Sequence, residues 1–162
     1  DIDTQDSRGD SALHYAAREG IVEMAKFLIG YQADSGMRVA NINLQNEFGE
    51  TALHLAIRSG ENVSVLESLI QHGGDINAKD KRGMRPIHHR TAKRLGSSAA
   101  MVRRLLLLVP EQTKRLRLLS TQDRFGQTAL HSAANRGTLG IFRVLFEAGA
   151  DLELCDRNGI KP

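Results

Sequence analysis

The sequence predicts an all-α protein built as a solenoid of helix-turn-helix repeats, and three observations lead to this prediction. Aromatic residues make up only 4% of the chain and Trp is absent, which favours helices packed through aliphatic side chains over a strand-rich fold. A short segment recurs along the chain, and such recurrence indicates a repeat architecture. Apolar residues follow a helical spacing within each period. The length, 162 residues, is usual for one domain.

The recurring segment mostly has the form Asp/Asn-x-x-Gly-x-Ser/Thr-Ala-Leu-His. Its glycines are Gly9, Gly49, Gly83, Gly126 and Gly159, separated by 40, 34, 43 and 33 residues. An acidic or amide residue three positions before a glycine suits a tight turn, because glycine readily adopts a positive φ. We therefore predict about four repeats, near residues 6–45, 46–79, 80–122 and 123–155, in one domain over 1–162, with a truncated fifth repeat from 156.

Each repeat is predicted to contain two helices. A hydroxyl residue is placed to cap the start of the first helix, and a glycine nine positions later provides a left-handed stop. These residues are Ser11, Thr51 and Thr128 for the caps and Gly20, Gly60 and Gly137 for the stops. The second helices carry apolar residues at helical spacing, such as Leu66 and Leu69 in the second repeat and Leu139 and Phe146 in the fourth. These faces should form a shared core, because no repeat buries its apolar side alone.

The repeat resembles the ankyrin repeat, whose pattern is a turn, a Thr-Pro-Leu-His helix start, a second helix and a Gly-Ala-Asp turn. The resemblance covers essentially the whole chain. It implies that hairpin tips and the outward face of the first helices line a concave binding surface. It also implies that the motif histidines tie the helix start to neighbouring backbone, so they are not catalytic or metal-binding residues. These histidines are His14, His54, His88 and His131.

Two insertions break the regular period, one at residues 31–41 and the other at 110–122. We expect Pro110 to end a helix over residues 101–109. Residues 111–119 should then form an extra basic helical turn or two that projects from the edge of the stack. The rhythm of long and short intervals is similar to that of the inhibitor proteins of NF-kappa-B. Fungal cell-cycle transcription regulators and bacterial effectors that carry ankyrin repeats remain open alternatives.

Basic residues concentrate in and beside the third repeat. Residues 79–117 hold 12 basic and two acidic residues, a charge of +10, whereas the rest of the chain carries −7. Within this band Arg85 and Arg90 replace the usual capping Thr and a small Ala. The band should attract an acidic partner, or else its side chains merely solvate the surface. Nucleic acid is disfavoured because the band lacks interleaved aromatic residues for base stacking. Direct binding of nucleic acid or anionic lipid through the band is a further, weaker alternative.

The sequence contains no recognisable catalytic or cofactor motif. It has no glycine-rich phosphate loop and no hydrolase serine elbow. His88 and His89 are adjacent, so they point in different directions on a helix, and no Cys or carboxylate lies at ligand spacing nearby in the sequence. We therefore expect a protein that is not an enzyme and that needs no cofactor or metal.

The single cysteine, Cys155, excludes an intrachain disulfide and fits a reducing compartment. The chain starts without the features of a signal peptide, and its longest apolar run is too short to cross a bilayer. These features predict an intracellular location, in the cytoplasm, the nucleus or both.

We predict that the chain is a scaffold, adaptor or regulator that binds a partner protein. By motif position the candidate residues are Arg8, Asp10, Arg18 and Glu19, then Phe48, Glu50, Arg58 and Ser59, then Arg82, Met84 and Lys93, then Phe125, Gln127, Asn135 and Arg136. The basic band adds Arg103 and Arg104. Phe48 and Phe125 are the most informative, since a large exposed ring at a hairpin tip either packs locally or meets a partner. The alternative is a targeting or regulatory arm of a larger enzyme or effector.

Overall fold

The computed structural model describes residues 1–30, 39–92, 99–109 and 111–162, without the side chains of residues 90–92. Over these residues the chain forms nine helices and no strand. The helices are α1 (Ala12–Glu19), α2 (Val22–Gly30), α3 (Ala52–Ser59), α4 (Val63–Gln71), α5 (Pro86–Ala92), α6 (Ala99–Leu107), α7 (Gln112–Leu119), α8 (Ala129–Asn135) and α9 (Leu139–Glu147). None of these helices is long and apolar enough to cross a membrane.

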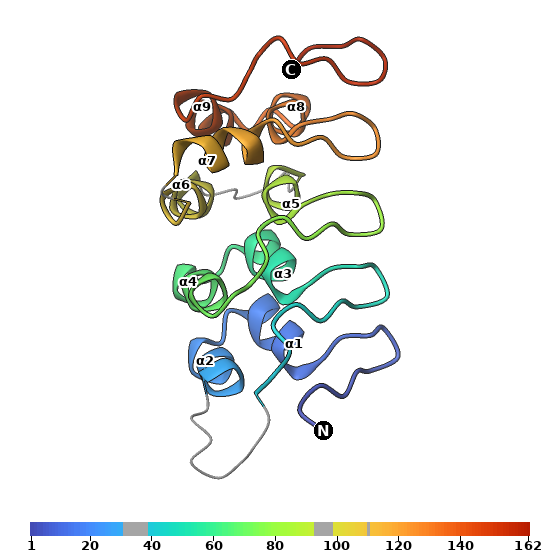
Figure 1. Ribbon diagram of the computed structural model, residues 1–162, viewed down its shortest axis with the longest axis vertical. Coiled ribbons are helices and arrows are strands. Elements are labelled where there is room, and N and C mark those ends of the chain that lie inside the picture. Colours follow the sequence, from blue (N-terminus) through green and yellow to red (C-terminus); the bar gives the residue numbers. More distant parts are fainter. Residues whose placement is uncertain (31–38, 93–98, 110) are drawn as a thin grey trace.

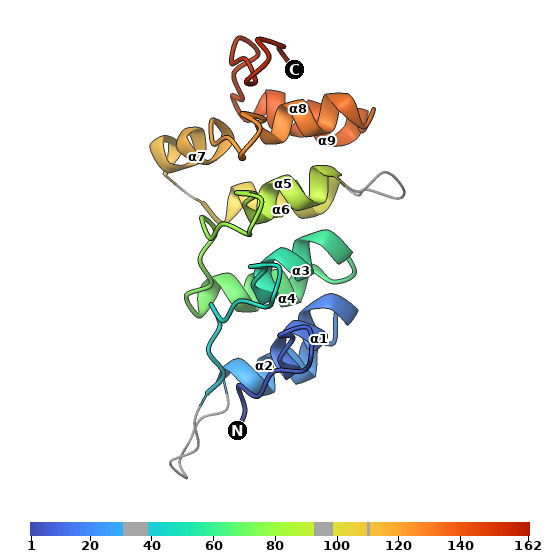
Figure 2. The same ribbon diagram turned by 90° about the vertical axis from the view of Figure 1, so that its right-hand side faces the viewer.

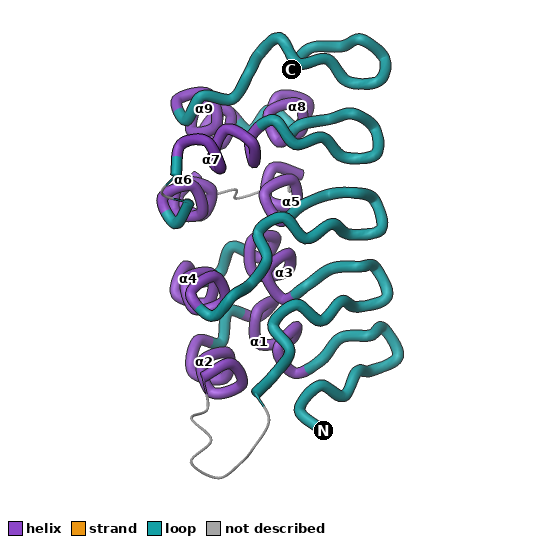
Figure 3. The backbone as a smooth tube through the Cα atoms, viewed as in Figure 1, coloured by secondary structure: helices purple, strands orange, loops and turns teal. Residues whose placement is uncertain are grey.

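The helices stack in two columns. Helices α1, α3, α5 and α8 form one column and α2, α4, α6 and α9 form the other, while the hairpins project from the first column (Figure 1). All of the projecting hairpins are loop in structure, with the helices confined to the two columns (Figure 3). The all-α solenoid predicted from the repeat is therefore confirmed.

The first helices begin and end where the sequence predicts. Ser11, Thr51 and Thr128 occupy the N-cap positions of α1, α3 and α8 with an extended backbone. At the other end of the helices, Gly20 and Gly60 adopt the left-handed conformation, with φ of 69° and 67°. Glycine adopts this conformation without the steric penalty that a Cβ brings, so the short length of these helices is set by sequence.

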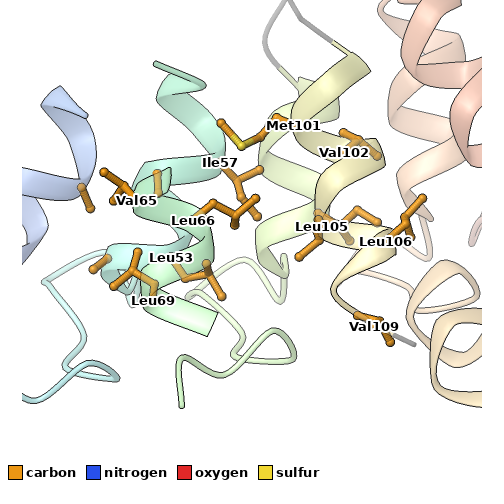
Figure 4. Packing of buried hydrophobic residues seen from close by; sticks show 14 of the residues in the cluster. Leu53, Ile57, Val65, Leu66, Leu69, Met101, Val102, Leu105, Leu106 and Val109 are labelled. Carbon is orange, nitrogen blue, oxygen red and sulfur yellow. The ribbon is translucent and has the colours of Figure 1, made fainter. Parts of the chain in front are cut away.

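The hydrophobic core lies between the two columns. Leu53 of α3, Leu66 of α4 and Leu105 of α6 are at most 1% exposed, and their side chains interdigitate between the helices (Figure 4). Burial of this kind, shared by neighbouring repeats, is the main source of stability in a solenoid. Leu139 and Phe146 were expected in this core, but they are 73% and 51% exposed. That expectation is wrong because α9 is the last described helix of its column, and no described helix covers its outer side.

Backbone hydrogen bonds tie each hairpin to the next. The amide of Lys81 donates to the Phe48 carbonyl (2.9 Å), and the amide of Arg124 donates to the Arg82 carbonyl (3.2 Å). Gly49 makes this close approach possible: its φ is 76°, and a Cβ added there would lie 2.8 Å from the Lys81 nitrogen. The hairpins therefore form a continuous, preformed ladder beside the first helices.

Helix α7 confirms the extra basic helix predicted for the second insertion. Leu118 and Leu119 are each 2% exposed and dock the helix against the stack. Helix α7 projects from the stack on the side away from the C-terminal ends of α1 and α3 (Figure 2). Helix α6 begins and ends two residues earlier than the predicted range of 101–109. Pro110 and residues 31–38 of the first insertion lie outside the described residues.

Candidate functional site

A groove of about 780 Å³ lies between the hairpins and the C-terminal ends of the first helices. Ten of the predicted binding residues line it, and they come from all four repeats. They are Arg18, Glu19, Arg58, Ser59, Arg82, Met84, Phe125, Gln127, Asn135 and Arg136. Positions that are scattered through 119 residues of sequence thus meet on one surface, because stacking places equivalent positions of successive repeats side by side.

The remaining predicted residues lie elsewhere. Arg8 and Phe48 are exposed on hairpins and do not line the groove. Arg103 and Arg104 are exposed on α6, in the other column of helices, so they do not share a surface with the groove residues. Lys93 lies outside the described residues.

Three predicted residues are buried, which corrects the expectation that they would be exposed. Asp10 is 4% exposed, Glu50 3% and Met84 9%. The two acids turn inward because each contacts an arginine on the following helix, and the apolar side chain of Met84 packs at the equivalent place in the third repeat. Of the three, only Met84 lines the groove, and Asp10 and Glu50 contact it only through the arginines that they pair with.

Two arginines that line the groove, Arg18 and Arg58, form ion pairs with buried carboxylates of the same repeat. Arg18 Nη1 lies 3.0 Å from Asp10 Oδ2, and Arg58 Nη1 donates to Glu50 Oε1. The arginine side chains remain 30% and 39% exposed. A guanidinium carries five N–H donors, more than one carboxylate can accept. Each arginine is therefore fixed by its acid while part of it still faces the groove.

His89 links the second and third hairpins below the same surface. Its Nε2 lies 3.0 Å from Asp80 Oδ2 and its Nδ1 lies 3.6 Å from Glu50 Oε1. Its ring stands edge-on to that of His54, with 4.9 Å between the ring centres. Arg82 completes the cluster, its Nε 3.7 Å from Asp80 Oδ2. The expectation that no carboxylate lies at ligand spacing near His89 is wrong, because Asp80 of the hairpin that precedes α5 and Glu50 of the preceding repeat both reach the ring.

The cluster is an ion-pair network in which each carboxylate faces both the imidazole and a guanidinium. Glu50, Asp80 and His89 place possible metal-binding atoms within 4.8 Å of one another, but Arg58 and Arg82 already balance the charge of the two carboxylates. Burial by itself raises the pKa of Asp80. Hydrogen bonds from His89 and from the Met84 and Arg82 amides outweigh burial and lower this pKa to about 2.

The motif histidines have the structural role that the resemblance implies. His54 Nδ1 accepts the Thr51 amide (3.1 Å), and its Nε2 lies 3.2 Å from the Met84 carbonyl of the next hairpin. Since Nδ1 accepts, Nε2 carries the proton and donates. Burial, and then the neighbouring His89, lower the pKa of His54 to about 4. Burial likewise lowers the pKa of His88 to about 4, so both rings are neutral at pH 7.

The described residues of the basic band lie on several separate surfaces. Acidic residues from inside and outside the band pair with part of it: Asp80 contacts Arg82, Glu67 contacts Arg104, and Glu111 contacts Lys114. The arginines are also divided between the groove, α6 and α7. Among the described residues, the positive charge of the band is therefore spread over several surfaces and partly paired with carboxylates.

The repeated hairpin, helix pair and histidine hydrogen bonds define the class of protein, and sequence comparison agrees. The family pattern described as ankyrin repeats (3 copies) matches residues 1–80, 35–114 and 62–156. The chain belongs to the ankyrin-repeat family.

Particular relatives include two whose names mention NF-kappa-B, one as a subunit and one as an inhibitor. The chain is 34% identical over 147 residues to the B-cell lymphoma 3 protein homolog of Mus musculus, and this alignment covers 90% of the chain and 30% of the relative. It is 32% identical over 150 residues to the nuclear factor NF-kappa-B p105 subunit of Gallus gallus, covering 93% of the chain and 14% of the relative. It is 32% identical over 145 residues to NF-kappa-B inhibitor alpha of Sus scrofa, covering 89% and 43%. The chain thus spans less than half the length of each of these relatives.

Sequence reasoning missed four residues that also line the groove: Glu61, His89, Asp123 and Ser132. His89 follows the capping position of its repeat by four residues, where the other repeats have Tyr15, Leu55 and Ser132. The change of residue type at this position was the available signal. The role of this residue depends on its contacts with Asp80 of its own repeat and Glu50 of the preceding repeat, which the period alone does not reveal.

Proposed function

We propose that this chain is a non-catalytic interaction module that binds a partner protein in the groove, inside the cell. The observation that carries the proposal is the meeting of ten motif-selected residues from four repeats on one groove of about 780 Å³. The hairpins beside it are tied together by backbone hydrogen bonds, and the first helices are packed in the core. A preformed surface of this kind costs little reordering on binding.

A regulatory role is supported by the relatives, whose names describe an inhibitor and a subunit of NF-kappa-B. We extend to this chain only the general role, regulation by holding a partner protein. If the module is the targeting arm of a larger enzyme, it binds through the same groove, and catalysis comes from sequence outside these residues.

The partner is proposed to present an acidic segment to the third and fourth repeats. Arg82 is 54% exposed at the groove. Arg136 is also exposed there, and no described carboxylate forms an ion pair with it. Phe125, 52% exposed, offers an apolar contact between these charges. An acidic segment with one apolar side chain suits this combination.

The test compares two double variants with matched chemistry. Arg136→Glu with Phe125→Ala changes the groove, and Arg103→Glu with Leu107→Ala changes the exposed outer side of α6. A partner isolated by affinity capture is purified, and its Kd for each variant is measured by calorimetry.

We expect the groove variant to weaken binding by a factor of ten or more, which corresponds to about 1.4 kcal/mol. The α6 variant should bind like the unmodified chain. The reverse pattern would refute the proposed groove and would move the binding surface to the outer helices.

A further inference from the structure

We propose that His89 is a positioning residue, which as an imidazolium holds Glu50 and Asp80 so that Arg58 and Arg82 receive acidic side chains of the partner. The inference rests on the proposed function, because it assigns a chemical role to part of the same groove. It adds two things that the repeat pattern does not contain: a specific pair of arginines and a residue that acts on both of them.

The first step is the position of His89 between two acids from different hairpins. Both ring nitrogens face carboxylate oxygens, Asp80 Oδ2 at 3.0 Å and Glu50 Oε1 at 3.6 Å. A neutral imidazole has one N–H donor, whereas an imidazolium has two. The arrangement therefore favours the charged ring, which alone directs a proton toward each acid.

The second step is the set of charges that surrounds this ring. Glu50 and Asp80 reach it from the second and third hairpins, and Arg58 and Arg82 lie beyond these acids. His54 of α3 contacts the ring edge-on and is neutral. Helix α8, on the other side of α5, contributes no ion pair to His89 among the described residues. Two negative charges adjoin the imidazolium directly, so its charge is locally compensated.

The third step connects the buried network to the groove. His89 is about 3% exposed, and Arg58 and Arg82 are 39% and 54% exposed. All three residues line the groove. Because each arginine is attached to an acid that His89 holds in place, His89 limits the directions in which the two guanidiniums point. Guanidinium groups that are oriented in advance are well suited to donate paired hydrogen bonds to carboxylates.

The chemistry identifies the ligand group as the carboxylate of Asp or Glu side chains on the partner. Arg58 and Arg82 lie on either side of His89 in the contact chain Arg58, Glu50, His89, Asp80, Arg82. Two separate acidic side chains, one for each arginine, therefore fit better than a single shared one. A helix or an extended segment of the partner can supply such a pair.

The experiment follows the arginine Nε–H and histidine ring resonances of the whole chain by NMR. The probe is a tetraglutamate peptide with both ends blocked. We compare the unmodified chain with His89→Leu, which introduces the residue found at the equivalent position 55. A second variant, His89→Gln, keeps one donor if the leucine variant does not fold. His72→Gln is the matched control, because His72 is exposed at the end of α4.

We expect the ring nitrogens of His89 to report an imidazolium at pH 7, and the peptide to shift the Arg58 and Arg82 signals. The peptide affinity should fall at least fivefold in the His89 variants and remain unchanged in His72→Gln.

Three outcomes would overturn the inference: a neutral His89 at pH 7, equal peptide affinity with and without His89, or no shift at Arg58 and Arg82. If the isolated partner still binds the Arg136→Glu with Phe125→Ala variant more weakly than the unmodified chain, the proposed function stands even when the inference about His89 is refuted. If that groove variant binds the partner normally, the proposed function fails as well.

Discussion

The motif histidines make the stability of the fold depend on pH in a defined window. His54 and His88 each have a folded-state pKa of about 4, below the ordinary value of 6.5. As the pH falls below 6.5, His54 and His88 become protonated in the unfolded chain but remain neutral in the folded chain. The stability that these two residues confer is therefore fully present above pH 6.5 and is lost progressively down to about pH 4.

The magnitude follows from the two pKa values. A shift of one pKa unit corresponds to about 1.4 kcal/mol, so the full loss is about 3 kcal/mol for each histidine. Between pH 7.5 and pH 5 linkage gives a loss of about 2 kcal/mol each, or about 4 kcal/mol for the two. This is a large part of the 5–15 kcal/mol that stabilises a typical domain. Asp80, with its pKa of about 2, loses its contribution only below about pH 3.8 and does not interfere.

The assay is urea unfolding followed by circular dichroism at half-unit steps from pH 7.5 to 5. His54→Gln should lower stability at pH 7.5, because the bond to the Met84 carbonyl is lost, but it should remove about half of the pH dependence. His72→Gln, at an exposed site, is the control and should leave the slope nearly unchanged. If His54→Gln retains the full slope, the buried neutral histidines are not its source and the reasoning is refuted.

Three further outcomes test other parts of the structure. Leu66→Ala should lower the free energy of unfolding by about 2–5 kcal/mol in urea titration, because Leu66 is fully buried between the columns, and a loss below about 1 kcal/mol would contradict this. Gly49→Ala should cost more than about 1–2 kcal/mol in the same assay, since backbone strain adds to the contact with the Lys81 amide, whereas an unchanged midpoint would rule out the tight hairpin. Excess Zn²⁺ should leave the melting temperature unchanged because Arg58 and Arg82 balance the acids around His89, and a clear rise would show that the cluster binds metal.

The repeat pattern predicted the helices well because their signals are local. Thr51 and Gly60 mark the start and stop of α3 within nine residues of sequence, and the apolar spacing of α4 follows from its own turns. The extra helix α7 was also predicted, from its basic and leucine-rich sequence after Pro110. Leu139 and Phe146 were misplaced, since their burial depends on whether another helix packs beyond α9.

The site was predictable in its location but not in its chemistry. Motif position correctly grouped Arg18, Arg58 and Phe125 on one groove. It could not show that Glu50 turns inward to Arg58, or that His89 reaches acids in two hairpins. The contacts of Glu50 with Arg58 and of Asp80 with His89 join residues eight and nine positions apart, whereas Glu50 and His89 are 39 positions apart and meet only because successive repeats stack.

The central claim is that the groove holds the partner protein, and site-specific photo-crosslinking tests it most directly. A photoreactive phenylalanine analogue replaces Phe125 in the groove in one variant and Leu107 on the outer side of α6 in another, both exposed positions. The account predicts that the purified partner is crosslinked through position 125 and not through position 107. Crosslinking through position 107 alone would contradict it.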